Sequence, residues 1–382
     1  MPSSRTPGGT PRLVYLVTED WYFISHRLPM ARAAQLAGFE VHVITRAGRH
    51  APAIRAEGFE LHNVHWDRGS LDPREFLRTV RAIRRIYRKL APRITHHVAL
   101  MPTIAGSLAA SGLRIICVNA ITGLGTTFAS NTRKLRIARV LLRGALQLAL
   151  RRADAAVLVQ NRDDAQAIAR LGIDPGRIHL IAGSGVDVER FKPVPEPSGA
   201  MTIGFAGRLL ESKGVRTLVE AHRLLLQRGR DIRLAIAGMP DPANPRSLDE
   251  HEIAAWRQQP NLVHLGFVDD MPGFWASAHI AVLPARGGEG LPLSLLEAAA
   301  CGRPLIATDT AGCRDIARPG INGLLVPPDQ AEKLAGAIET LADNPAMRSR
   351  MGEAARRLVE REFSSERIGR DTVAMYRRLL SP

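Results

Sequence analysis

The 382-residue chain contains little cysteine, few aromatic residues and no long apolar run. Its three cysteines show no CxxC spacing, which argues against a disulfide framework or a zinc site. No apolar run is long enough to cross a bilayer, and the Ser/Pro/Gly/Arg-rich residues 1–12 lack the apolar centre of a signal peptide. These absences predict a cytoplasmic protein with a flexible tail over residues 1–12.

Acidic residues are too few to balance the basic ones, since 52 Lys and Arg face 37 Asp and Glu, a net charge of +15. Such an excess indicates anionic partners: nucleotide phosphates, nucleic acid or an anionic membrane surface. Aromatic residues make up only 5% and no basic-aromatic stacking motif occurs, so nucleic acid is the weakest of the three.

Short apolar runs alternate with helical patterns along the whole chain, which is typical of an α/β fold with parallel sheets. The first strand is expected at residues 13–17, then a loop at 18–25 and a helix at 28–37. The first turn lacks GxGxxG, which argues against an NAD site. A segment with three prolines, residues 192–199, is typical of a linker. The alternation restarts after it, so the length and pattern predict two domains, 13–191 and 200–362, with a C-terminal helix over 363–382.

A glycine-rich turn enters a predicted helix near Pro292. Glu289 precedes this helix and Glu297 lies about 8 Å along its axis from Pro292. Free N–H groups at a helix start suit phosphate oxygens, and carboxylates suit sugar hydroxyls. The pattern therefore predicts a nucleotide-binding site, although solvated glutamates in an ordinary helix would give the same spacing.

Two cations follow the first strand of the second half, in the segment Gly207-Arg208 to Lys213-Gly214. Arginine and lysine near a helix start suit a diphosphate, whereas a solvated loop is the alternative. The chain has no Asp-x-Asp, so neither a metal site nor a cofactor is expected.

Taken together, these motifs resemble the retaining glycosyltransferases of family 4. The matching segments, densest after Ala182, are Gly185-Val186-Asp187, Phe191-x-Pro193, Gly207-Arg208, Lys213-Gly214, Glu289-x7-Glu297, Cys301-Gly302-x-Pro304-Leu305-Ile306-Ala307-Thr308, Thr310-Ala311-Gly312 and Asn322 to Pro328. The resemblance implies the GT-B fold, in which two Rossmann-like domains face each other across a cleft and the C-terminal helix crosses back to the first.

The resemblance also assigns roles to single residues. Arg208 and Lys213 would hold the donor diphosphate, Glu289 the transferred sugar and Glu297 the ribose. Gly207, Gly290 and the amides of Leu293, Ser294 and Leu295 would surround the phosphates, and the backbone at Val268 would face the nucleobase.

In the first half, the segments Tyr22 to Pro29, Thr95 to Pro102 and Asn119 to Gly125 resemble the branch that builds capsule, O-antigen and protein-linked glycans on polyprenyl diphosphate. Gly123 and Gly125 would bind substrate there. His97, or else His96, would be a catalytic histidine, and His26 and Arg27 would contact acceptor or phosphate. The chain departs from many relatives in its first loop, where Trp21-Tyr22-Phe23 stands in place of a Gly-Gly pair, and at Met101, where a lysine is expected.

Two predicted helices are strongly basic and suggest attraction to an anionic membrane, although solvated arginines on packed helices are the alternative. Their cations are Arg78, Arg81, Arg84, Arg85, Arg88 and Lys89 on the first, and Arg133, Lys134, Arg136, Arg139 and Arg143 on the second.

The function expected from the resemblance is transfer of a sugar from a nucleotide sugar, with UDP as the expected nucleotide, to a polyprenyl-diphosphate-linked or other lipid-linked saccharide at the inner membrane face. A nucleotide-sugar epimerase or hydrolase of the same architecture, and a basic nucleic-acid-binding protein, remain as alternatives.

Overall fold

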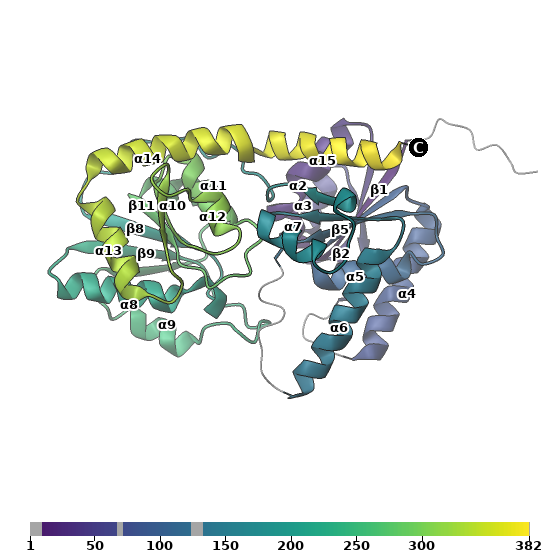
Figure 1. The fold of residues 1–382 in the computed structure, drawn as a ribbon, viewed down its shortest axis with the longest axis horizontal. Coiled ribbons are helices and arrows are strands. Elements are labelled where there is room, and N and C mark those ends of the chain that lie inside the picture. The colour runs from purple at the N-terminus through teal and green to yellow at the C-terminus, as the bar shows by residue number, and fades with distance from the viewer. Residues whose placement is uncertain (1–9, 67–71, 124–132, 382) are drawn as a thin grey trace, which may run out of the picture.

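The computed structural model describes residues 10–66, 72–123 and 133–381, the last range without the side chains of residues 133–141. Figure 1 shows two α/β halves side by side, each built around one sheet. All strand pairs within both sheets are parallel. The predicted α/β fold with two Rossmann-like domains is therefore confirmed.

The first domain contains a seven-stranded sheet in the order β3-β2-β1-β4-β5-β6-β7. The strands are β1 (Arg12–Glu19), β2 (Glu40–Arg46), β3 (Glu60–Asn63), β4 (Ile94–Val98), β5 (Ile116–Ile121), β6 (Ala155–Val159) and β7 (Ile178–Leu180). Helices cover both faces, so the inner strands β4 and β6 are buried at every residue. This explains why the strands appear in the sequence as continuous apolar runs.

The helices of the first domain follow the strands in alternation. They are α1 (Asp20–His26), α2 (Leu28–Leu36), α3 (Ala51–Ala56), α4 (Pro73–Leu90), α5 (Leu100–Ala109), α6 (Arg133–Arg151), α7 (Arg162–Ala169) and the short 3-10 turn η1 (Pro175–Arg177).

The loop predicted at residues 18–25 is wrong, because β1 continues to Glu19 and α1 begins at Asp20. The buried carboxylate of Asp20 accepts hydrogen bonds from the backbone N–H groups of Trp21, Gly48 and His50, at 2.8, 2.7 and 2.9 Å. Two of these donors lie beyond β2, so the contacts that fix the start of α1 are not visible in the local sequence.

The second domain contains a six-stranded sheet in the order β10-β9-β8-β11-β12-β13. The strands are β8 (Met201–Ala206), β9 (Ile232–Ala237), β10 (Leu262–Gly266), β11 (Ile280–Leu283), β12 (Leu305–Thr308) and β13 (Gly323–Val326). The helices are η2 (Glu211–Lys213), α8 (Val215–Gln227), α9 (Glu250–Trp256), α10 (Met271–Ala276), α11 (Leu293–Ala300), α12 (Cys313–Ile316), α13 (Ala331–Ala342) and α14 (Pro345–Leu358).

The C-terminal helix crosses back to the first domain, as predicted. A π-helical turn, η3 (Val359–Phe363), follows α14, and α15 (Ser365–Leu380) then packs along α2 (Figure 1). The hydroxyl of Tyr376 on α15 lies 2.9 Å from the Tyr15 hydroxyl and 2.5 Å from Nδ1 of His96. These buried hydrogen bonds tie the helix to β1 and β4.

The proline-rich segment 192–199 is held against the second domain. The Arg303 guanidinium donates to the carbonyls of Val194 and Pro195 at 3.0 and 3.1 Å, and Arg348 forms an ion pair with Glu196 at 2.5 Å. The linker is thus anchored on one side, although the domain boundaries themselves remain predictions.

Candidate active site

The loop between β11 and α11, residues 284–292, lies against the first domain. A Cβ on Gly290 would stand 2.0 Å from Oε1 of Gln160, and a Cβ on Gly123 would stand 2.3 Å from the Gly288 carbonyl oxygen. Nδ2 of Asn161 donates to the Gly290 carbonyl at 2.7 Å. Gly123 and Gly290 are therefore needed for a close approach between the domains, while Gly125 lies outside the described residues.

Lys213 lies next to this loop because η2 ends against it. Gly214 has φ +70°, and a Cβ there would stand 1.8 Å from the Pro284 carbonyl oxygen. The Nζ atom of Lys213 lies 2.8 Å from the Glu289 carboxylate, and only 17% and 13% of the two side chains are exposed. Lys213, which was predicted to hold the diphosphate, and Glu289, which was predicted to hold the sugar, thus form an ion pair in the structure.

Arg208, the second predicted cation, contacts both domains. Its Nη1 lies 2.8 Å from Oδ2 of Asp241 in the second domain, and its guanidinium lies 5.9 Å from the ring centre of Trp21 in the first. The backbone before it, at Gly207, passes close to Gly238, where a Cβ would stand 1.9 Å from the Gly207 carbonyl oxygen.

The loop that carries Val268 also lies near the first domain. Val268 is half-buried against the core of the second domain, and its neighbour Phe267 stacks with the Arg49 guanidinium, 5.4 Å from the ring centre. A second crossing contact, the ion pair between Arg314 and Asp163 at 2.7 Å, connects the domains near α12.

His26 faces the two cations of the second domain. Its ring stacks on Tyr22 with centres 4.1 Å apart, and its Nδ1 lies 2.6 Å from the Ser25 hydroxyl. Burial, together with the positive charges of Arg27, Lys213 and Arg208, lowers the pKa of His26 to about 3. His26 is therefore a neutral hydrogen-bonding group at the domain boundary.

Arg27, by contrast, is fully buried inside the first domain. Its Nη1 donates to the His26 carbonyl at 3.0 Å, while Nε and Nη2 have no hydrogen-bond partner among the described residues. The structure does not bring Arg27 to the surface that His26 occupies.

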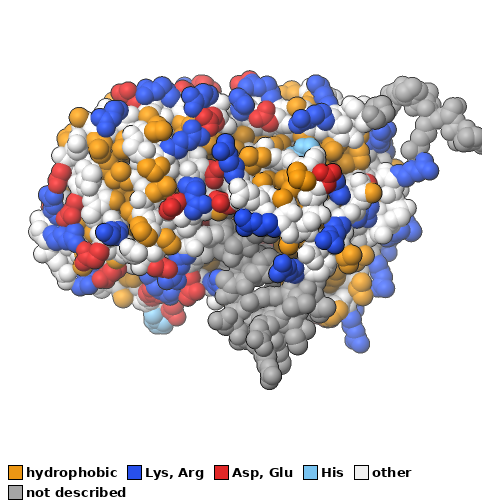
Figure 2. Space-filling model, in the orientation of Figure 1, with side chains coloured by type: hydrophobic (Ala, Val, Ile, Leu, Met, Phe, Trp, Pro, Cys, Tyr) orange, Lys and Arg blue, Asp and Glu red, His pale blue; other side chains and the backbone are white. Residues whose placement is uncertain are grey.

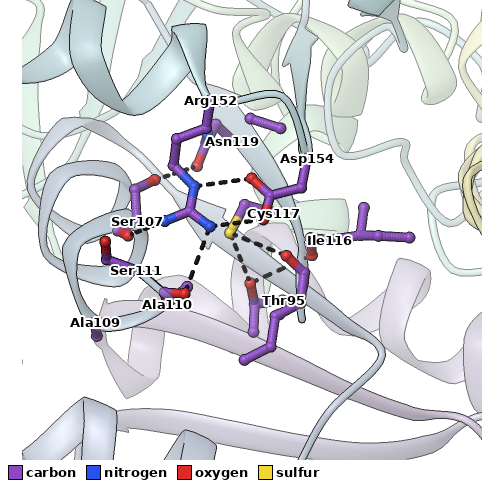
Figure 3. A network of polar contacts seen from close by, with 12 residues as sticks. Thr95, Ser107, Ala109, Ala110, Ser111, Ile116, Cys117, Asn119, Arg152 and Asp154 are labelled. Carbon is purple, nitrogen blue, oxygen red and sulfur yellow. Dashed lines mark hydrogen bonds and ion pairs between the residues drawn. The ribbon is translucent and has the colours of Figure 1, made fainter. Parts of the chain in front are cut away.

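His97 is also buried, and both ring nitrogens are engaged. Nε2 lies 3.1 Å from the Tyr87 hydroxyl and Nδ1 lies 2.8 Å from Oδ1 of Asn119. Figure 3 shows that Asn119 belongs to a polar network in which Arg152 binds Asp154 and the Ser107 carbonyl. This geometry gives His97 a structural role, and its catalytic role stays a prediction that the contacts do not support.

Glu297 lies on α11 beyond the Lys213–Glu289 pair along the chain. Burial raises the pKa of Glu297, and Trp275 and Arg190 oppose this effect only in part, so that the resulting pKa is about 7. At neutral pH the carboxyl group is thus close to half ionised. It can accept hydrogen bonds from hydroxyl groups, and its ionisation will be sensitive to a bound ligand.

The start of α11 presents backbone amide groups that are not hydrogen-bonded within the helix. Pro292 is the N-cap and supplies no side-chain hydrogen bond, so the N–H groups of Leu293, Ser294 and Leu295 have no partner within the helix. A helix end of this kind, with Lys213 beside it, is suited to an anion.

Sequence reasoning did not select four residues that contact the second domain at this site, Trp21, Thr122, Gln160 and Asn161, or the Arg208 partner Asp241. Trp21 lies in the helix α1 that the sequence did not predict, and the others lie in loops. The glycines gave the one usable signal, because a glycine-rich turn indicates a close backbone approach.

Two Rossmann-like domains, a helix that crosses back, and charged groups collected between them define the GT-B class. Two family models match the chain, "Glycosyl transferase 4-like" over residues 12–161 and "Glycosyl transferases group 1" over residues 200–344. The chain belongs to this glycosyltransferase family.

Relatives and solved structures are similar over different lengths. Capsular polysaccharide biosynthesis glycosyltransferase CapM of Staphylococcus aureus is 29% identical over 47% of this chain, and the match spans only 46% of CapM. The Campylobacter jejuni N,N'-diacetylbacillosaminyl-diphospho-undecaprenol alpha-1,3-N-acetylgalactosaminyltransferase is 24% identical over 87% of this chain and 92% of its own length. Anabaena Alr3699/HepE, solved with UDP and glucose, has a TM-score of 0.78 at 17% identity, covering 96% of this chain and 99% of that one.

Proposed function

We propose that this protein transfers a sugar from a UDP-sugar to a saccharide linked to polyprenyl diphosphate, with retention of configuration and without a metal ion. The observation that carries the proposal is the Lys213–Glu289 pair beside the free amides of α11, at a site that both domains line. The HepE neighbour, of the same fold, was solved with UDP and glucose, and the Campylobacter relative is named for a diphospho-undecaprenol acceptor.

The donor diphosphate would bind between Lys213, Arg208 and the amides of Leu293 to Leu295. These groups supply positive charge where a metal ion would otherwise be needed, and they stabilise the negative charge that develops on the leaving diphosphate. Glu289 stays within reach of Lys213 and would accept hydrogen bonds from the transferred sugar. Glu297 would bind the ribose hydroxyls, most strongly when ionised.

In the reaction, the bond between the anomeric carbon and the phosphate oxygen breaks, and the diphosphate takes the electron pair. The acceptor hydroxyl oxygen forms the new bond on the same face of the sugar, and its proton passes to the departing phosphate oxygen. The protein contributes position and electrostatic stabilisation, and His26, which is neutral, would contact a substrate without carrying charge.

The membrane-bound acceptor would be approached through the basic face of α4, which consists of Arg74, Arg78, Arg81, Arg85 and Arg88. These side chains recur every three or four residues, are exposed, and form no ion pair with another described residue. Figure 2 shows a row of basic side chains along the margin where α4 lies in Figure 1. The basic face would bind anionic lipids of the inner leaflet.

Two parts of the predicted basic surface stand apart from this face. Arg84 donates to the carbonyls of Ala109 and Ser111, so it serves the packing of α4 on α5. The side chains of Arg133, Lys134, Arg136 and Arg139 on α6 lie outside the described residues. Among the described residues no helix is both long and apolar enough to cross a membrane.

The donor test is a panel of UDP-, GDP- and ADP-sugars incubated with lipid-linked saccharides from membrane extract, with EDTA present and absent. We expect acceptor-dependent transfer from one UDP-sugar that EDTA does not abolish. Lys213→Ala should lower the rate at least 100-fold, because one preorganised charge at a leaving group contributes on this order. Lys192→Ala, at an exposed linker lysine, is the control. Equal donor turnover without acceptor would instead indicate a hydrolase or epimerase.

The membrane test is co-sedimentation with vesicles of phosphatidylcholine alone or with phosphatidylglycerol. A triple Arg78/Arg81/Arg85→Gln variant should lose binding to the anionic vesicles. The control removes the same charge from exposed positions of the second domain, Arg233, Lys333 and Arg350. If both triple variants bind alike, net charge explains the attraction and the basic face has no special part.

A further inference from the structure

A cluster of histidine and glutamate side chains lies at the edge of the first sheet, away from the site described above. His42 and Glu40 point to the same face of β2, and His62 and Glu60 point to the same face of the edge strand β3, because side chains alternate along a strand. The register pairs His42 with Glu60 across the two parallel strands. Three of these groups therefore meet over neighbouring backbone positions.

One ligand atom from each of His42, Glu60 and His62 lies within 4.8 Å of the other two. Nδ1 of His42 lies 3.3 Å from Nε2 of His62 and 3.2 Å from Oε2 of Glu60, and the other Glu60 oxygen, Oε1, lies 3.7 Å from Nε2 of His62. Ligands about 2.0–2.1 Å from a tetrahedral Zn²⁺ are about 3.3 Å apart. The 3.2 and 3.3 Å separations therefore match an edge of such a tetrahedron.

The surroundings of His42 fit a metal ligand. Its ring is 1% exposed, and Nε2 lies 3.1 Å from Oε1 of Glu40, whose other oxygen, Oε2, binds Arg12 at 2.9 Å. With Nε2 next to Glu40, Nδ1 lies next to a Glu60 oxygen and Nε2 of His62. A carboxylate that orients a histidine in this way is typical of metal sites.

We propose that His42, His62 and Glu60 bind one Zn²⁺, with water in the fourth position and Glu40 orienting His42. Two imidazoles and one carboxylate favour Zn²⁺ over Mg²⁺ or Ca²⁺, which prefer oxygen ligands. The ion joins the four-residue edge strand β3 to β2 near the start of both strands, at the edge of the sheet opposite the carboxyl ends. Its role is therefore to hold the edge of the sheet rather than to take part in transfer.

The experiment uses untagged full-length protein that has been treated with EDTA and freed of it. Zn²⁺ titrated by calorimetry should bind with one equivalent and raise the midpoint of thermal unfolding by a few degrees, because an ion that binds only the folded state stabilises it. Co²⁺ in its place should give the intense visible absorption of a tetrahedral site.

Two variants and one control locate the ion. His62→Gln and Glu60→Gln should each weaken Zn²⁺ binding at least tenfold and abolish the Co²⁺ band, while unfolding in EDTA stays as in the unaltered protein. His251→Gln, at an exposed histidine of α9, should change nothing. The proposal is overturned if no Zn²⁺ binds, or if both variants bind it as the unaltered protein does.

Discussion

Replacing Glu297 by glutamine should stabilise the folded protein above pH 7 while weakening its binding of a nucleotide sugar. Burial raises the pKa of Glu297 from an ordinary value of 4.5 to about 7. Since one pKa unit corresponds to about 1.4 kcal/mol, the ionised carboxylate destabilises the folded state by about 3 kcal/mol at most. Glutamine keeps the shape of the side chain and cannot ionise.

The sign of the pH dependence follows from which state binds the proton more tightly. Between pH 4.5 and 7 the folded protein keeps the Glu297 proton and the unfolded chain releases it, so the stability of the folded state falls as pH rises through this window. Glu297→Gln lacks this fall. Its stability relative to the unaltered protein should therefore increase by about 2–3 kcal/mol between pH 5 and pH 8.

Urea unfolding at pH 5 and pH 8, followed by tryptophan fluorescence, measures this difference; Trp275 lies close to Glu297 and reports on the same region. Glu353→Gln, at an exposed glutamate of α14, is the matched control and should show no such increase. The stability of the unaltered protein falls as pH rises, but its affinity for a UDP-sugar should rise with pH through about 7. In Glu297→Gln the affinity should not change with pH. A stability difference that does not vary with pH would refute the reasoning.

Three further predictions test other parts of the structure. Gly290→Ala should lower kcat/KM at least tenfold, because its Cβ would stand 2.0 Å from Gln160 and 2.8 Å from the Thr122 carbonyl oxygen, and Gln160→Ala should restore part of the loss. Tyr376→Phe should lower the free energy of unfolding by about 1–3 kcal/mol, since it leaves buried groups of Tyr15 and His96 without a partner; full stability in urea would contradict this. The folded pKa of His26 is about 3, so stability is lost as pH falls below the ordinary value of 6.5; His26→Gln should flatten this loss, and an unchanged acid dependence of the urea midpoint would count against it.

The sequence predicted most of the fold because parallel strands buried on both faces leave continuous apolar runs, and proline and glycine mark their ends. The strand predicted at residues 13–17 lies within β1 (Arg12–Glu19), and the helix predicted at 28–37 is α2 (Leu28–Leu36). The edge strand β13 was missed, since Leu324 and Leu325 are only half-buried and the run shows neither alternation nor full burial. The helix α1 was missed because its start is fixed by contacts with residues beyond β2.

The sequence by itself determined the two α/β halves, the family, and the residues of the second domain that collect near α11, because those motifs are local in the chain. Tertiary structure alone decided which of them touch. Lys213 and Glu289 are 76 residues apart and form one ion pair, and Asn161 reaches the Gly290 carbonyl across the domain boundary. The same long-range packing buried His97 between Tyr87 and Asn119 and joined His42 to His62 across two strands. Such contacts depend on which strands and helices become neighbours in space, which side-chain periodicity along a single chain does not encode.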